Sequence, residues 1–470
     1  MSLHVRLQEP VASPIELPAH AGGHDISERS RRYGFRDGAC QAITQGSGEQ
    51  YLSAFALLLH ASSFQLSLLS ALPQLFGTAA QIASVKLLRW FPDRTSLIRT
   101  GTIGQALAWV PIILFPLLLP EYGPWLVILG TALYFACLQF TMPTWNSFIA
   151  DHLDQHERGA YFARRAKIMA ILSFVALCTA GWLLSMWQHH PLAWIGFALI
   201  FTVAGSARFL SARALTRVQD IRHPAHRDGE HGFRSFLGTT SRSFRRFLLF
   251  SGLMHAAVLI AGPFFVIYML RDLHWSYLNY GTWLAAGILG QLVTLGAWGR
   301  FGDRFGNKAL LGVTGLMVPF LPMLYLAGTN LGFLLVVNFL GGVTWGGLAL
   351  GLQNYVFDAV RPEDRAKAVA TYSTINALGW CLGAFLGSWL VDALPSHIEV
   401  AQLSLRLASN LPLVFFISGI SRLLVSTSLL GSFQEARSVE RAALHHLLWE
   451  LPLLKPIARL MAGPLSRASK

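Results

Sequence analysis

Long apolar runs dominate the chain, and short polar stretches separate them. Most runs are close to twenty residues long, and a helix of that length, rising about 1.5 Å per residue, crosses a hydrocarbon core of about 30 Å. The pattern predicts twelve membrane-spanning helices, at residues 39–60, 64–88, 96–119, 122–146, 163–187, 191–213, 246–270, 276–299, 308–328, 331–357, 368–391 and 408–430. The expected fold class is therefore an all-α polytopic membrane protein.

The longest polar interruption divides the predicted spans six and six. Residues 216–244 are polar and basic, which is typical of a linker between two helical bundles. The expected domains are an N-tail (1–38), a six-helix bundle (39–214), a basic linker (215–245), a second six-helix bundle (246–431) and a C-tail (432–470). The first 38 residues carry five arginines and no apolar core of the kind that a secretory signal needs. We therefore expect the N-tail to stay on the chain, in the cytoplasm.

The charge content excludes an ordinary soluble protein, because 13% of residues are charged against roughly 25% in soluble domains. The formal charge of +13 could indicate a nucleic-acid partner. With both tails placed inside, however, every Lys and Arg except Arg271 and Arg406 lies in the tails, at the cytoplasmic end of a span or in connections on the same side. The positive-inside rule accounts for this excess. We expect the lipid bilayer as the partner surface, and no nucleic acid.

The two halves carry matching polar motifs. QIASVKLLRWFPDRT begins at Gln81 and QLVTLGAWGRFGDRF at Gln291, and each has Asp-Arg twelve residues after the Gln. DHLDQHERGA and DAVRPEDRAK share an acid, five spacers and an acid-Arg pair, and Arg208 aligns with Arg422. The four acid–arginine pairs are Asp93-Arg94, Glu157-Arg158, Asp303-Arg304 and Asp364-Arg365. Several matches in order, at nearly constant offset, predict parallel repeats of six spans each.

The stretch GRFGDRFGNK is close to the G-x-x-x-D-R-x-G-R-K loop of the major facilitator superfamily, and the chain from about 39 to 431 resembles that family of secondary transporters. The resemblance implies two six-helix bundles related by an axis along the membrane normal, with a site near the midplane between them. Three departures speak against drug efflux. The first-half loop LLRWFPDRTSL lacks the family's glycines, the fourth span holds no arginine, and the fifth lacks a G-P-x-x-G-G-like motif.

The resemblance also implies a role for the four acid–arginine pairs. In the family, contacts of this kind join the halves when the cytoplasmic side is closed and break as it opens. An acid near a helix N-terminus gains about 0.3–1 kcal/mol from the helix dipole, and arginine can bind a carboxylate through two hydrogen bonds. We therefore expect the eight residues to form a cytoplasmic gate. The alternative is that they only mark membrane topology.

Glu49 is the only carboxylate deep within a predicted span. A charge at the bilayer centre costs about 2.5–3.5 kcal/mol on insertion scales, so such a group is a functional candidate. Glycines at positions 46 and 48 loosen the helix beside it. We expect Glu49 to bind a proton, or to contact a cationic or hydroxylated substrate. The alternative is a structural hydrogen bond to a neighbouring helix.

Further candidates for substrate or proton binding are polar or aromatic residues within spans. His255 occupies the position that matches Gln45 at an offset of 210, so it could face the same site from the other half. The complete set besides Glu49 is Gln45, Tyr51, His255, Gln139, Asn338 and Trp345. Their alternative role is helix packing. His152 and His156 have metal-ligand spacing but no third ligand, so we expect no metal.

No phosphate-binding loop, nucleophile elbow or zinc-protease motif occurs in the sequence, so we expect no enzyme activity and no cofactor. The predicted function is secondary transport of a small organic solute by alternating access, with proton coupling through Glu49. The alternatives are a uniporter or exporter without a proton step, and a sensor or scaffold that keeps the fold without transporting. The arginine-rich basic set and compact loops favour a bacterial inner membrane. We expect a monomer with both termini in the cytoplasm.

Overall fold

The structure is a computed structural model that describes residues 21–153, 155–190, 192–216, 218, 220, 238, 240–361, 364–395, 397–400, 403–406, 409–437 and 439. These residues form twelve long helical segments, so the predicted all-α membrane fold is confirmed. Ten segments are long and apolar enough to cross a membrane. The other two, which contain α1 and α11, hold more polar residues and pack lengthwise against members of the ten.

The first bundle contains the helices up to residue 215. α1 begins well before the predicted span, and a short break separates it from α2. The elements are α1 (Ala21–Ser47), η1 (Glu49–Tyr51), α2 (Leu52–Leu58), α3 (Ser63–Leu87), η2 (Leu88–Trp90), α4 (Arg94–Leu118), η3 (Pro120–Tyr122), α5 (Gly123–Asp151), α6 (Gln155–Trp187) and α7 (Ala193–Leu215).

The second bundle repeats this order. Its first helix is also broken, at Gly262 and Pro263, and prolines interrupt its third. The elements are α9 (Arg242–Leu259), η4 (Gly262–Phe264), α10 (Phe265–Ile267), η5 (Tyr268–Asp272), α11 (Tyr277–Phe305), α12 (Asn307–Met317), α13 (Phe320–Met323), η6 (Leu324–Leu326), α14 (Leu331–Asp358), α15 (Arg365–Ala393), α16 (Leu411–Leu429) and η8 (Leu430–Ser432).

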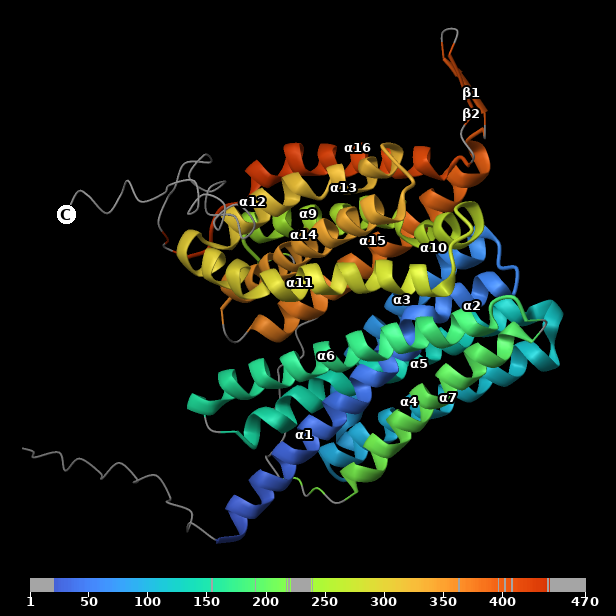
Figure 1. The fold of residues 1–470 in the computed structure, drawn as a ribbon. Helices are drawn as coiled ribbons and strands as arrows, with labels where there is room; N and C mark the ends of the chain where they lie inside the picture. The colour runs from blue at the N-terminus through green and yellow to red at the C-terminus, as the bar shows by residue number, and fades with distance from the viewer. Residues whose placement is uncertain are drawn as a thin grey trace, which may run out of the picture.

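A short β-hairpin between α15 and α16 was not predicted from the apolar pattern. Strands β1 (His397–Val400) and β2 (Leu403–Arg406) pair antiparallel, with His397 opposite Arg406. Four-residue strands carry too little alternation to stand out beside twenty-residue apolar runs. The hairpin extends from the end of the bundle (Figure 1).

Local hydrogen bonds explain where several helices begin. Ser62 and Gln65 form a reciprocal capping box at the start of α3. Asp93 caps α4 by accepting from the Ser96 N–H at 2.6 Å, and Ser276 caps α11 by accepting from the Asn279 N–H. Such caps satisfy N–H groups that have no partner inside the helix. The polar connections therefore set the helix limits.

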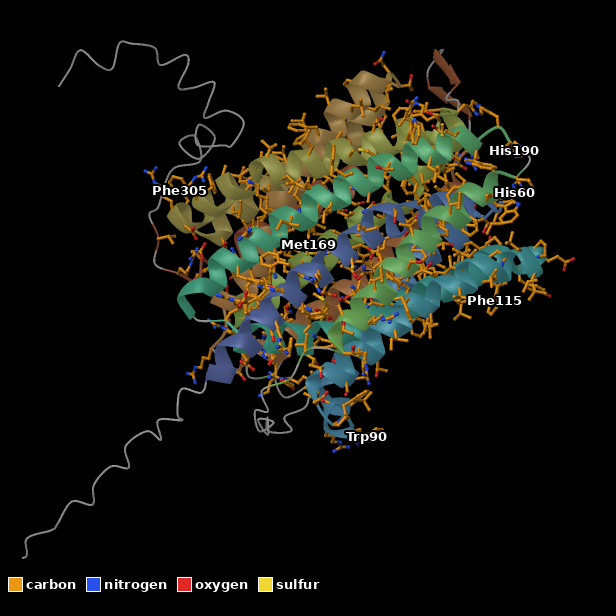
Figure 2. The ribbon with its side chains drawn as sticks, turned by 60° about the horizontal axis from the view of Figure 1, so that its bottom comes forward. His60, Trp90, Phe115, Met169, His190 and Phe305 are labelled. Carbon is orange, nitrogen blue, oxygen red and sulfur yellow. The ribbon has the colours of Figure 1, made fainter. Side chains whose placement is uncertain are left out.

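Large apolar side chains cover the outside of both bundles. Phe115 is 45% exposed and Leu129 67% exposed, and Trp389 on α15 is 65% exposed. Phe115 projects outward from its helix in Figure 2. Exposed apolar surface on this scale indicates contact with a membrane rather than with water.

The two bundles meet at one end and diverge at the other (Figure 1). We call the meeting end the contact end; it holds the turns at His60 and His190. The opposite end, called the tail end, holds the turns at Trp90 and Phe305 (Figure 2). At the contact end, the Tyr277 N–H of α11 donates to Gln188 Oε1 across the bundles at 3.0 Å.

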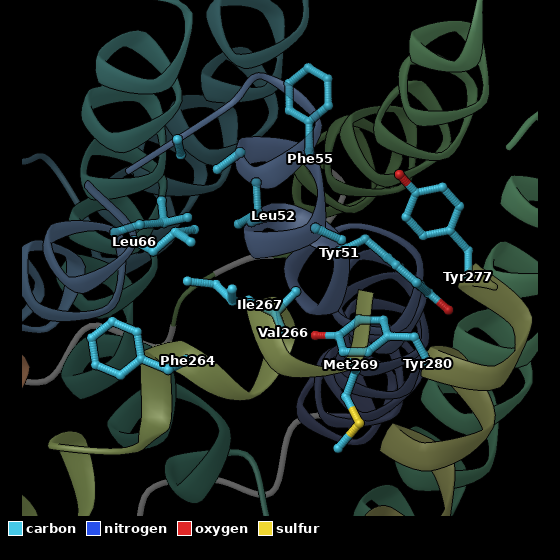
Figure 3. Close-up of a cluster of buried hydrophobic side chains, with 14 of the residues drawn as sticks. Tyr51, Leu52, Phe55, Leu66, Phe264, Val266, Ile267, Met269, Tyr277 and Tyr280 are labelled. Carbon is cyan, nitrogen blue, oxygen red and sulfur yellow. The ribbon is translucent and has the colours of Figure 1, made fainter. Parts of the chain in front are cut away.

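Two glycines and a tyrosine form the close crossing of α6 and α11. A Cβ added to Gly281 would lie 3.5 Å from the Gly181 Cα and 2.5 Å from the Tyr51 hydroxyl. Tyr51 is fully buried here, and its hydroxyl donates to the Leu177 carbonyl at 2.8 Å. Figure 3 shows Tyr51 beside Tyr280 in this apolar seam. Glycine on both helices permits this close approach, because a larger side chain would displace Tyr51 or force the helices apart.

Candidate functional site

The break in the first helix places Glu49. Gly48 separates α1 from η1, and a Cβ at that position would lie 2.5 Å from the Trp109 ring and 2.9 Å from Ala204. Only glycine therefore lets α1 approach α4 and α7 this closely. Because the first helix of the second bundle is also broken, the two breaks form a corresponding pair, which is the arrangement that marks binding sites in duplicated transporters.

Both hydrogen bonds to the Glu49 side chain reach the same oxygen. Tyr134 of α5 donates its hydroxyl to Glu49 Oε1 at 2.5 Å, and Gln41 donates its amide N–H to that atom at 3.1 Å. Oε2 accepts no hydrogen bond from any described residue, and the side chain is half-buried. The carboxylate is thus held in one orientation by neutral donors, with one oxygen left to accept a proton or a substrate N–H or O–H.

A buried ion cluster lies in the same bundle, nearer the tail end. Arg208 Nη1 lies 3.0 Å from Asp37 Oδ1, and Arg165 Nη2 lies 3.2 Å from Asp37 Oδ2. The Ser211 hydroxyl donates to Asp37 at 2.8 Å, and the Arg165 guanidinium lies 4.1 Å from the Trp145 ring. The apolar pattern did not predict this cluster, because by that pattern Asp37 belongs to the N-tail. The unnoticed signal was a polar residue on a helix that starts at Ala21.

The other predicted residues of the first bundle have varied surroundings. Gln45 is exposed on α1. Tyr51 belongs to the buried crossing at the contact end, which favours a packing role. Gln139 packs against Gly77 between α5 and α3.

Among the predicted residues of the second bundle, His255 has one ring nitrogen, Nε2, without a hydrogen bond to a described residue. His255 Nδ1 lies 2.8 Å from the Ser251 carbonyl, its ring stacks on Trp380, and the residue is half-buried. Asn338 donates to the Trp283 carbonyl at 2.5 Å, which favours packing between α14 and α11. Trp345 is half-buried against the apolar cluster of the second bundle. The structure brings Glu49 together with Gln41 and Tyr134, and leaves His255 in the other bundle.

The first-half pair of the predicted gate makes contacts within its own bundle. Arg94 binds Asp151 at 2.5 Å and Asp220 at 2.7 Å, so it joins the tail-end termini of α4, α5 and α7. Partial burial alone would raise the pKa of Asp93, but hydrogen bonds from Ser96 and Thr95 lower it below its ordinary value. Asp93 is therefore an ionised helix cap.

The remaining gate residues also lie at the tail end. Asp303 is exposed and has no hydrogen bond or ion pair to a described residue. Arg304 is exposed and lies over the Phe305 ring. Asp364 binds Lys367 one turn along α15, and the neighbouring Arg365 is exposed. Glu157 and Arg158 belong to α6, but their side chains lie outside the described part of the chain.

Residues after α16 cover the α11–α12 turn. Glu435 Oε2 accepts from the Lys308 N–H at 2.7 Å, directly beside Gly306, whose φ is +92°. Arg437 lies 3.2 Å from Asp358 and donates to the Gly302 carbonyl. By the apolar pattern these residues belong to the C-tail, for which no contacts were predicted. These contacts hold the segment after α16 against the tail end of the second bundle.

Comparison with known proteins agrees with this architecture. A sequence model described as the Major Facilitator Superfamily matches residues 247–443. Multidrug resistance protein 2 of Bacillus subtilis is 28% identical over 26% of this chain and 30% of its own length. Quinolone resistance protein NorA of Staphylococcus aureus is 24% identical over 38% of this chain and 42% of its own. The matched stretches thus span less than half of these relatives.

Solved structures match the chain over most of its length. Nucleoside transporter NupG superposes with a TM-score of 0.62 at 11% identity, covering 87% of this chain and 99% of its own. A bacterial homologue of ferroportin in an inward-facing state gives 0.62 at 13% identity, covering 86% and 98%. A D-xylose-proton symporter gives 0.63 at 12% identity, covering 88% and 99%. At such low identity these likenesses describe the fold alone.

Proposed function

From the Major Facilitator Superfamily model that matches its second bundle, and from a fold shared with solved transporters, we propose that this chain is a secondary transporter of a small organic solute. The observation that carries the proposal is Glu49, a half-buried carboxylate held by Tyr134 and Gln41 at a helix break, with one oxygen unoccupied. The two bundles would alternate access to a site between them.

The arrangement of the bundles supports a specific cycle. In the present state the bundles diverge at the tail end (Figure 1), and the Gly181–Gly281 crossing holds them together at the contact end. In the alternate state the crossing parts and the tail ends approach. The eight gate residues belong to helix termini at the tail end, so closure would bring the acid–arginine pairs of the two bundles together. Contacts that exist in one state only are the means by which a small change shifts such an equilibrium.

Proton coupling would operate through Glu49. The carboxylate accepts hydrogen bonds from neutral groups and makes no direct salt bridge to a described Lys or Arg. A proton, or a cationic group of the substrate, can therefore bind Glu49 without breaking an ion pair of that carboxylate. His255 would face the site from the second bundle with its free Nε2, and Gln45 from α1. A hydroxylated substrate could donate to Glu49 in the same position.

A second candidate is export without a proton step. Relatives named multidrug and quinolone resistance proteins favour export of organic compounds, although the family's antiport motif is missing from the fifth span. Uniport and export without a proton step are both distinguished from proton-coupled transport by their indifference to a pH gradient. A sensor or scaffold that keeps the fold would transport nothing.

The charge distribution supports a location and an orientation. We place the tail end in the cytoplasm of a bacterial cell, with both termini inside, because nearly all Lys and Arg residues lie in the tails, at tail-end helix termini or in connections at that end. The bundles would correspond to residues 39–214 and 246–431, joined by the basic linker 215–245. The proposed partners are a small-molecule substrate, protons and lipid, with a monomer as the transporting unit.

Thermal stabilisation of the purified protein tests the site first. A metabolite and drug library is screened at two pH values against wild type and Glu49→Gln, with Glu121→Gln as the matched control because Glu121 is exposed on η3. A compound that stabilises wild type and the control but not Glu49→Gln supports the proposal. That compound is then followed into proteoliposomes with and without a pH gradient. If no compound binds any form, a sensor or scaffold becomes the better interpretation.

A further inference from the structure

Besides the Arg94 ion pairs at the tail end, the described residues of the first bundle place two acids and two arginines in its interior. Asp37 forms salt bridges with both Arg165 and Arg208, which leaves the cluster of these three residues with one excess positive charge. Glu49 receives hydrogen bonds only from neutral groups. Counted together, the four charges balance when Glu49 is ionised.

The cluster and Glu49 are linked along α1. Gln41 follows Asp37 by one helical turn and donates its amide N–H to Glu49. Its carbonyl oxygen is buried without a hydrogen bond to any described residue, and so is Nε of Arg208. A buried donor and a buried acceptor of this bundle are thus unsatisfied by described residues, which is costly unless water binds them.

The second bundle provides an internal comparison. Arg422 matches Arg208 in the repeat and is equally buried, but its guanidinium donates to the Val318 and Val258 carbonyls. No carboxylate pairs with Arg422 among the described residues, and the position matching Asp37 is Phe247. The fold can therefore hold a buried arginine here without an acid. The ion cluster of the first bundle is an addition that the fold does not require.

We propose that Asp37, Arg165 and Arg208 are positioning residues for Glu49, which balance its charge so that a proton bound there leaves one uncompensated positive charge inside the first bundle. This inference rests on the proposed proton coupling. Charge imbalance in a low-dielectric interior is costly. The excess charge would destabilise Arg165, which belongs to α6 near the tail end. The Arg165 side chain is partly exposed and lies over the Trp145 ring. Proton binding at Glu49 would thereby shift the equilibrium between the two arrangements of the tail end, in which the bundles diverge or approach.

All charged and titratable groups that face the two acids enter the test. Three groups face Glu49: Tyr134 from α5, Arg208 from α7 and the neutral amide of Gln41 from α1. The groups that face Asp37 are Tyr33 and Cys40 from α1, Arg165 and Tyr161 from α6, and Arg208 from α7.

The experiment uses the proton itself as the ligand. Full-length protein in lipid nanodiscs is titrated by infrared difference spectroscopy, and the carboxylic-acid band that Glu49→Gln abolishes reports protonation of Glu49. Asp37→Asn leaves two arginines opposite Glu49, so we expect the midpoint of this band at a pH lower by about one unit. Arg208→Gln removes a positive charge, so we expect a rise of similar size. Arg208→Lys should restore the wild-type midpoint, and Arg422→Gln should leave it unchanged.

Opposite shifts for Asp37→Asn and Arg208→Gln support the proposal. If neither variant moves the midpoint, or both move it the same way, the cluster is structural only, and proton coupling stands. If wild type shows no Glu49 band, proton coupling fails, and Arg208→Gln then tests whether the cluster holds Glu49 ionised. A band that stays absent in Arg208→Gln overturns both the proton coupling and the positioning role of the cluster. Should Asp37→Asn not fold, Arg165→Gln replaces it, because that side chain is partly exposed. Both arginine variants are then expected to raise the midpoint, and a midpoint that stays unchanged or falls in either of them would show that the cluster is structural only.

Discussion

Gly281→Ala should open the contact end. The added Cβ would lie 2.5 Å from the Tyr51 hydroxyl, against an ordinary contact of about 3.5 Å, so the hydroxyl must retreat by about 1 Å or the bundles must part. Retreat breaks the hydrogen bond to the Leu177 carbonyl, at about 0.5–1.5 kcal/mol. Overpacking adds about 1–3 kcal/mol.

The combined cost of about 1.5–4.5 kcal/mol falls on one state only. It applies where α6 and α11 cross closely, and it vanishes when the contact end opens. Since about 1.4 kcal/mol is a tenfold change in an equilibrium constant, the balance between the two states should move by between about tenfold and about a thousandfold. The contact-closed state should therefore lose most of its population unless it is favoured by a larger margin.

Pulsed EPR distances measure this shift. Spin labels at the exposed residues Tyr122 and Thr329 report the contact end, and labels at Trp90 and Arg361 report the tail end, after replacement of the native cysteines. We expect Gly281→Ala to lengthen the first distance and shorten the second. The matched control is Gly299→Ala on the same helix, where an added Cβ meets nothing within 4 Å. Identical distributions for the two variants would refute the reasoning.

Three further outcomes are expected. Tyr134→Phe removes one hydrogen bond to Glu49, so the Glu49-dependent stabilisation by a ligand should change by about 1–3 kcal/mol while folding is kept; unchanged affinity would show that Tyr134 only packs. Asp303→Asn should lower the transport rate while insertion into the membrane stays normal, since Asp303 is exposed and supports no described contact; unaltered kinetics would count against the gate. Phe433→Ala should lower the free energy of unfolding by about 3–5 kcal/mol because Phe433 is fully buried, whereas Phe320→Ala, 54% exposed, should change it little; equal thermal shifts would contradict the burial argument.

Several features of this protein follow from the sequence alone. The twelve helical segments, their six-and-six division and the asymmetry of basic residues depend on run length and charge, which are local properties of the chain. Glu49 stands out for the same reason, because a lone acid in an apolar run is visible without any neighbour. The helix start at Asp93 is also local, since its partner lies three residues away.

Tertiary structure decided which groups meet. Asp37 and Arg208 are 171 positions apart, and Tyr134 and Glu49 are 85 positions apart. Neither pairing can therefore be predicted from a local sequence pattern. The same holds for Glu435, which a tail assignment hid, and for Gly181 against Gly281. Helix packing selects these contacts through the close approach of whole helices, which depends on many side chains together. The polar groups and their helices are thus readable from the chain, whereas their electrostatic partners are set only when the bundles assemble.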